Sequence, residues 1–156
     1  MIALSSKIRF VTAEHIQYRT ANEVSISLNK TCTIDAHLSY NVEVLLTDME
    51  FDPVPAKIPH VYTVNTVAAR EHVVEIEREI RLVKERKQAT LNTLTLRAVP
   101  KQVIIKLVYL TALWINTFSE KKGLSKMYSP REIISVQKLD FKLHLQNGLW
   151  RVCQGE

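Results

Sequence analysis

The sequence predicts an α/β fold, and three observations support this. Short β-branched runs alternate along the chain with longer segments of helical periodicity. The run 103–118 is apolar almost all round, which is typical of a buried core helix. The segment 70–88 carries a single apolar stripe, within about 80° on a helix, made of Val73, Ile76, Ile80 and Val83. The expected order is strand, helix, strand, strand, helix, helix.

The N-terminal part predicts strands followed by a helix. Residues 2–13 read as one or two short strands around a polar turn, with alternation in the second strand from Ile8. Thr20 and Glu23 have the spacing of a capping box, so we expect a helix from there to about Ala36. The buried positions expected on this helix are Val24 and Leu28.

Two further strands are expected in the middle of the chain. Residues 42–47 form a run of strand length that ends in Asp48, and 61–64 form a second short strand. Asn65 or Thr66 then caps the helix that follows. An acid after a strand lies where open α/β sheets bind ligands, although an aspartate there also caps turns. Prolines rule out a helix between the two strands, at positions 53, 55 and 59.

The second half predicts two more helices. Pro100 fits the first turn of the buried helix, which we expect to end at Gly123. Ser129 followed by Pro130 is a strong signal for a helix start. Asn147 and Gly148 favour a tight hairpin near the C-terminus.

The helix expected over 70–88 carries the candidate site. Glu77 lies about 40° from Val73, at the border between the apolar stripe and solvent. The same border holds Arg81, Lys84 and Gln88. The far side, expected to be solvated, holds Glu75, Glu79 and Arg86. A metal-binding acid beside a row of residues that contact phosphates would give this pattern. An ordinary solvated helix face, with weak ion pairs four residues apart such as Arg81 with Glu85, would give it as well.

Composition narrows the class of protein. Residues 1–69 carry 5 Lys/Arg against 7 Asp/Glu, whereas 70–156 carry 16 against 9, which favours a polyanionic partner for the second half. Cys32 and Cys153 lie far apart and outside any zinc-binding spacing, so reduced thiols in an intracellular protein are expected. The apolar run 103–118 is too short to span a membrane.

Asp48 and Glu77 together indicate a specific chemistry. A strand-end aspartate and a glutamate on the next amphipathic helix, here with 28 residues between them, is how nucleic-acid phosphoryl-transfer enzymes place two Mg²⁺ ions. Carboxylates hold such ions about 4 Å apart, and the metals stabilise the attacking and leaving oxygens. The predicted metal ligands are therefore Asp48 and Glu77.

Four sequence blocks carry a resemblance to a known family. They are LLTDMEFDPV at 45–54, NTVAAREHVVEIEREIRLVKERKQA at 65–89, LWINTFSEKKGLS at 113–125 and SPREII at 129–134. In this order and spacing the chain resembles the integrase catalytic core of copia-type retrotransposons. The resemblance covers about 2–144, so we expect a partial core over 1–145 and a divergent tail over 146–156.

The resemblance implies a ribonuclease H-like fold and integration of retrotransposon DNA by strand transfer. Family members use an Asp-Asp-Glu triad with Mg²⁺ or Mn²⁺, and its second aspartate and its glutamate map onto Asp48 and Glu77. DNA is the implied partner and the nucleus the implied location. Residues beside the acids would contact DNA phosphates, namely Arg81, Lys84 and Gln88.

The resemblance is incomplete at the first triad acid. In the family this aspartate lies on the first strand, upstream of the segment that matches 8–16, and Asp35 does not match it. The expectation is a core that lacks its first strand, is catalytically inactive and binds divalent ions weakly. A missing central strand would also expose unpaired backbone groups.

Two alternatives remain open from the sequence. In the first alternative, the chain is a non-catalytic DNA-binding or dimerising module, and the apolar helix at 100–118 is the surface for a homodimer. In the second alternative, the reading frame is a truncated gene, and a strand carrying aspartate is encoded in frame upstream of Met1.

Overall fold

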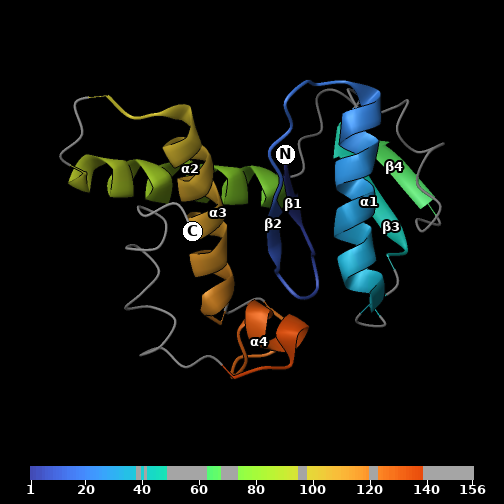
Figure 1. Ribbon diagram of the computed structural model, residues 1–156. Coiled ribbons are helices and arrows are strands. Elements are labelled where there is room, and N and C mark those ends of the chain that lie inside the picture. The colour runs from blue at the N-terminus through green and yellow to red at the C-terminus, as the bar shows by residue number, and fades with distance from the viewer. Residues whose placement is uncertain are drawn as a thin grey trace. The chain divides into compact units, whose positions relative to one another are not determined.

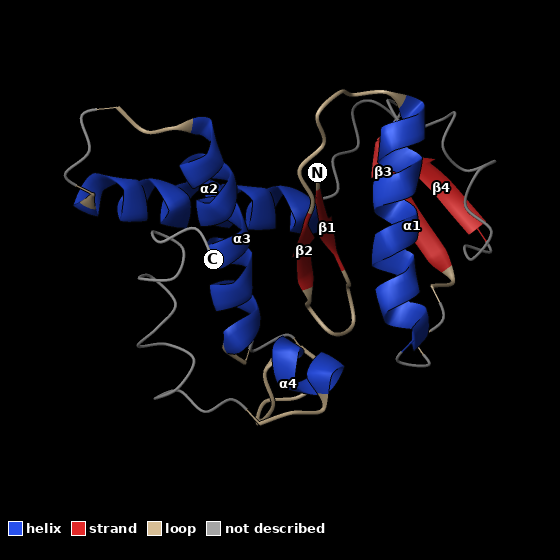
Figure 2. Ribbon diagram, in the orientation of Figure 1, coloured by secondary structure: helices blue, strands red, loops and turns tan. Residues whose placement is uncertain are grey.

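The computed structural model describes residues 1–37, 40, 42–48, 63–67, 74–94, 98–119 and 123–138 (Figure 1). The described part is mixed α/β, with strands and helices in the order β-β-α-β-β-α-α-α (Figure 2). Contacts divide the chain into two compact units. Unit 1 is Met1–Ala3 with Glu14–Arg78, and unit 2 is Leu4–Ala13 with Glu79–Glu156.

In unit 1, helix α1 (Ala21–His37) packs against strand β3 (Val44–Asp48), which pairs in parallel with β4 (Thr63–Val67). The buried pair on α1 is Val24 and Leu28, as the sequence predicted. The partly buried apolar residues that pack against this pair are Met1, Ile16, Ala21 and Leu45. Leu45 thus faces α1, whereas its neighbours on β3 are exposed, because successive strand residues point to opposite faces.

The start of α1 follows the predicted cap, with one change of partner. The Glu23 amide donates to Thr20 Oγ1 at 3.3 Å, which is one half of a capping box. The Glu23 carboxylate accepts from the Tyr18 amide at 2.8 Å. The Glu23 carboxylate therefore fixes the backbone at Tyr18, two residues before the cap residue Thr20.

The N-terminal hairpin consists of β1 (Ile2–Leu4) and β2 (Val11–Ala13). Its turn is longer than the sequence predicted. The Ser5 amide donates to the Phe10 carbonyl at 2.9 Å, and the Arg9 amide donates to the Ser5 carbonyl at 2.7 Å. The second strand therefore begins at Val11 and not at the expected position, because the backbone turns at Arg9 with φ 62°.

Unit 2 is built on helix α3 (Lys101–Thr117), which packs against β2 and against the short helix α4 (Pro130–Ser135). Asn116 joins α3 to β2. Its Oδ1 accepts from the Val11 amide at 2.8 Å, and its Nδ2 donates to the Val11 carbonyl at 2.7 Å. Among the described residues of the unit, the buried apolar side chains are Ile8, Val11, Val83, Leu107, Leu110, Ala112, Ile115 and Ile134.

Several predicted boundaries were wrong. Asn65 and Thr66 lie inside β4 and do not cap a helix. The described helix α2 runs over Val74–Thr93, so it extends beyond the predicted end at 88. Helix α3 ends at Thr117, where the next residue adopts an extended backbone, and not at Gly123. The proline-containing loop, the hairpin at 147–148 and the tail 146–156 lie outside the described residues. Among the helices described, none is long and apolar enough to cross a membrane.

Helix α4 begins as predicted and ends with backbone strain. Ser129 and Glu132 form a complete capping box, and Pro130 is the first helical residue. At the other end Val136 adopts the left-handed conformation, with φ 56°, and its amide donates to the Glu132 carbonyl at 3.0 Å. A β-branched residue is disfavoured there because its Cβ crowds the backbone.

Val136→Gly is therefore expected to stabilise unit 2 by about 0.5–1 kcal/mol. Val136 is exposed, so the substitution removes no core packing. Urea unfolding followed by tryptophan fluorescence measures this change, since Trp114 belongs to unit 2. Val136→Ala retains the Cβ atom and should stabilise less; equal effects of the two variants would contradict the strain.

Candidate nucleic-acid interface

Helix α2 presents one exposed polar face and one buried face. The exposed face includes Arg81, Lys84 and Gln88, which lie within about 60° of one another on the helix. Glu77, in the first turn, is exposed on the same face. The predicted set therefore shares one solvent-exposed surface of one helix, although Glu77 lies in solvent rather than at the rim of a core.

Side-chain hydrogen bonds run along this face. Arg81 Nε donates to Glu85 Oε1 at 2.8 Å, as the four-residue spacing predicted. This hydrogen bond and the Glu85 charge raise the pKa of Arg81 above its ordinary value. Gln88 Nε2 donates to Asn92 Oδ1 at 3.0 Å. The Arg81–Glu85 pair is well exposed, so it is a weak interaction.

The prediction for Glu79 was wrong. It was expected on the solvated side, yet only 1% of its surface is exposed, and its Oε1 accepts from the Arg9 guanidinium at 2.8 Å. Glu79 lies about 40° from Val83 on the helix, so it borders the apolar stripe opposite Glu77. Both sides of this ion pair are buried, because the turn of the hairpin brings Arg9 to that border.

Of the two predicted metal ligands, the structure describes the side chain of Glu77 but only the backbone of Asp48. Asp48 is the last residue of β3, in register with Val67 of β4, so its backbone lies at the carboxyl end of a parallel strand pair. Its side chain lies outside the described residues. That Asp48 and Glu77 meet in one site therefore stays a prediction.

A divalent-ion site needs several convergent ligands. Within the described ranges, no group of three His, Cys, Asp or Glu side chains gathers as such a site requires. The exposed Glu77 carboxylate alone offers too few oxygens for the six ligands that Mg²⁺ prefers. We therefore derive no chemical step through a metal.

The difference in net charge between the two structural units is larger than the difference between the two halves of the sequence. Unit 2 contains 16 Lys/Arg against 6 Asp/Glu, whereas unit 1 contains 5 against 10. The hairpin turn brings Lys7 and Arg9 into unit 2, and the start of α2 leaves its first glutamates in unit 1. The sum of +10 on unit 2 is the feature of the molecule that points most directly to a polyanion.

Comparison with known proteins finds no match: no protein-family model, no curated protein and no solved structure is similar to this chain.

Proposed function

We propose that the chain is a core fragment of a copia-type retrotransposon integrase, with a ribonuclease H-like fold, whose retained activity is binding to DNA. The observation that carries the DNA-binding part is the basic unit 2, with 16 Lys/Arg against 6 Asp/Glu, and the exposed polar face of α2 within it. The described part of the chain is mixed α/β, the class to which the ribonuclease H-like fold belongs.

The contact would be made chiefly with the phosphate backbone. Arg81 and Lys84 supply the cations, and Gln88 supplies an amide donor from the same helix face. Contacts to phosphates position a protein on DNA without reading the base sequence, and they release counterions. Binding should therefore be insensitive to DNA sequence and should weaken steeply as salt is added.

The acids have a separate role in the proposal. Asp48 and Glu77 correspond to two members of the integrase triad, and bound Mg²⁺ or Mn²⁺ would stabilise charge at the reacting phosphate. Strand transfer also needs the first triad aspartate, for which this sequence has no matching residue. The activity proposed for the chain as given is DNA binding, at a nuclear location.

The double substitution Arg81→Ala and Lys84→Ala tests the α2 face. Affinity for DNA should fall by a similar factor for unrelated sequences, and the slope of log affinity against log salt should drop by about two. Fluorescence anisotropy with two unrelated duplexes at several salt concentrations measures both quantities.

The control for this variant is Arg19→Ala with Lys30→Ala, which removes two exposed cations from unit 1. We expect little change in DNA affinity from this control. An unchanged affinity in the α2 variant would refute the role of this face.

A dimerising module is the second candidate, and one observation favours it. Tyr109 and Leu113 lie four residues apart on α3, and each is 41% exposed. They form an exposed apolar pair on the part of α3, from Leu107 onward, that is otherwise mostly buried. A sizing experiment with a DNA titration at two salt concentrations separates the candidates: a dimer without affinity for DNA favours this one.

A further inference from the structure

The loop before α4 exposes large apolar side chains in the basic unit. Met127 is 87% exposed and Tyr128 is 54% exposed, and Leu124 in the same loop is also exposed. Single exposed apolar residues are normal on protein surfaces. Two consecutive ones of this size, in a loop of a unit with a strong positive charge, need a specific explanation.

Hydrogen bonds at both ends hold this loop in shape. Ser125 Oγ accepts from the Met127 amide at 3.1 Å and from the Tyr128 amide at 3.0 Å. Directly afterwards, Ser129 and Glu132 form the capping box of α4. The two apolar residues therefore sit between two fixed turns, and their exposure is part of the folded loop.

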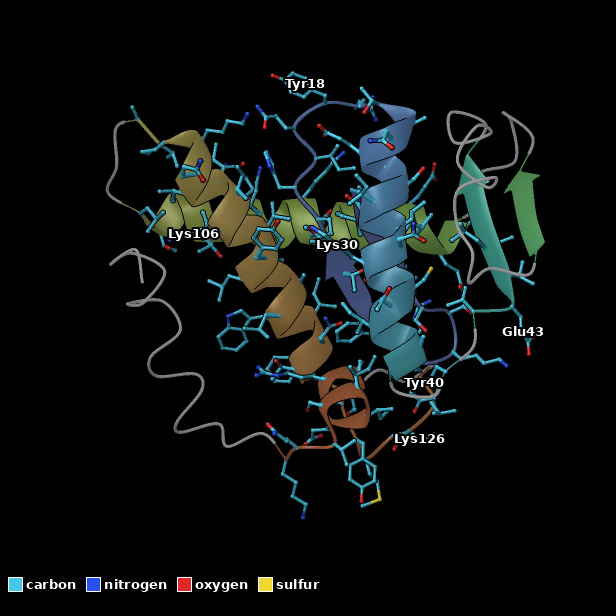
Figure 3. The ribbon with its side chains drawn as sticks, turned by 45° about the vertical axis from the view of Figure 1, so that its right-hand side comes forward. Tyr18, Lys30, Tyr40, Glu43, Lys106 and Lys126 are labelled. Atoms are coloured by element: carbon cyan, nitrogen blue, oxygen red, sulfur yellow. The ribbon has the colours of Figure 1, made fainter. Side chains whose placement is uncertain are left out.

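The described segment 123–138 around the loop carries more cations than acids. Lys126 precedes Met127 in the chain and is exposed, as Figure 3 shows on the loop beside α4. Lys138 is exposed after the helix. The acid in this segment, Glu132, is engaged in the capping box and is only partly exposed. A partner for the loop must therefore offer negative charge together with an apolar or planar surface.

We propose that this loop is a wedge for DNA: Met127 and Tyr128 insert against the bases of a duplex while Lys126 contacts a neighbouring phosphate. The inference rests on the DNA binding proposed above. Apolar side chains such as methionine partly unstack base steps in known minor-groove proteins, and aromatic rings stack on bases. Cations on the same unit supply the attraction to phosphates that makes such insertion favourable.

Two other classes of partner fit these observations less well. An anionic membrane fits less well because two loop side chains bury little area for stable anchoring. A specific protein partner normally covers about 800 Å² on each side, well beyond one short loop. DNA requires only dispersed phosphate contacts and a local insertion.

The test compares Met127→Ser/Tyr128→Ser with the wild-type chain on a DNA duplex that contains 2-aminopurine, whose fluorescence rises when it is unstacked. The wild type should raise the fluorescence, and the variant should not. The variant should also bind about tenfold to a hundredfold more weakly, with an unchanged salt slope because no cation is lost. Lys126→Ala should instead lower the salt slope by about one.

The matched control is Tyr18→Ser, which removes a tyrosine that is 62% exposed in the acidic unit 1. It should leave both the affinity and the fluorescence change intact. Since all the substituted side chains are exposed, unchanged circular dichroism is expected throughout.

The outcomes separate the two proposals. Wild-type DNA binding without any fluorescence change, with affinity kept by the double variant, overturns the wedge and leaves the DNA-binding function standing. No binding of the wild type to DNA overturns both, and a parallel titration with anionic lipid vesicles then shows whether the loop binds membranes instead. Loss of the fluorescence change in the double variant alone supports the wedge.

Discussion

Replacing Glu79 with alanine is expected to lower the free energy of unfolding of unit 2 by about 3–5 kcal/mol. The substitution leaves the Arg9 guanidinium buried without the carboxylate that accepts its hydrogen bond at 2.8 Å. Removing one partner of a buried ion pair is among the most costly changes in a protein interior. Urea unfolding followed by tryptophan fluorescence measures the loss, since Trp114 lies in unit 2.

Glu85→Ala is the matched control on the same helix. Glu85 pairs with Arg81 at the same distance, 2.8 Å, but the two side chains are 59% and 81% exposed. Its removal should cost at most about 0.5 kcal/mol. The double variant Arg9→Met with Glu79→Met replaces both charges by apolar groups and should be about as stable as the wild type. Equal losses from Glu79→Ala and Glu85→Ala would refute the importance of burial.

The existence of most described elements could be predicted, because local patterns decide them. Thr20 and Ser129 mark helix starts through their hydroxyls, and the structure confirms both starts. Val24 and Leu28 are four residues apart on one helix face, and both are buried as expected. Such features depend on neighbours within one or two turns, so a sequence pattern contains the necessary information.

Element boundaries were less predictable where alternation of polar and apolar residues had two explanations. Ile8 begins a run of alternating residues, which suggested a strand, but in the structure it lies in a turn and is buried in the core of unit 2. Thr66 has a hydroxyl suited to a helix cap, but it continues β4, where β-branched residues are equally favoured. Local preference alone could not choose between these outcomes.

In the candidate site, too, some features follow from local sequence patterns and others depend on the tertiary fold. Periodicity placed Arg81, Lys84 and Gln88 together on α2, and the structure places all three on its exposed face. Periodicity could not show which border of the apolar stripe would be covered. Glu79 is buried because its partner Arg9, 70 residues away in the sequence, reaches it through the folded hairpin. Contacts over such separations depend on the tertiary fold.

Asn116 is a second residue whose role depends on a distant partner, and Asn116→Leu is expected to lower the stability of unit 2 by about 2–4 kcal/mol. In the sequence it appears only as a polar interruption of an apolar helix. In the fold its amide pairs with both backbone groups of Val11, 105 residues away, as a neighbouring strand would. Leucine fills similar space but leaves the buried Val11 N–H and C=O without these hydrogen bonds.

The adjacent substitution Thr117→Val provides the control for Asn116→Leu. Thr117 is also buried, but its hydroxyl donates to the Leu113 carbonyl of its own helix, and that carbonyl keeps a backbone partner. This change should cost less than about 1 kcal/mol. Hydrogen exchange at the Val11 amide gives an independent measurement: it should accelerate in Asn116→Leu and stay slow in Thr117→Val. Equal protection of Val11 in both variants would show that Asn116 does not hold β2 on α3, because the bond from its side chain is what shields that amide.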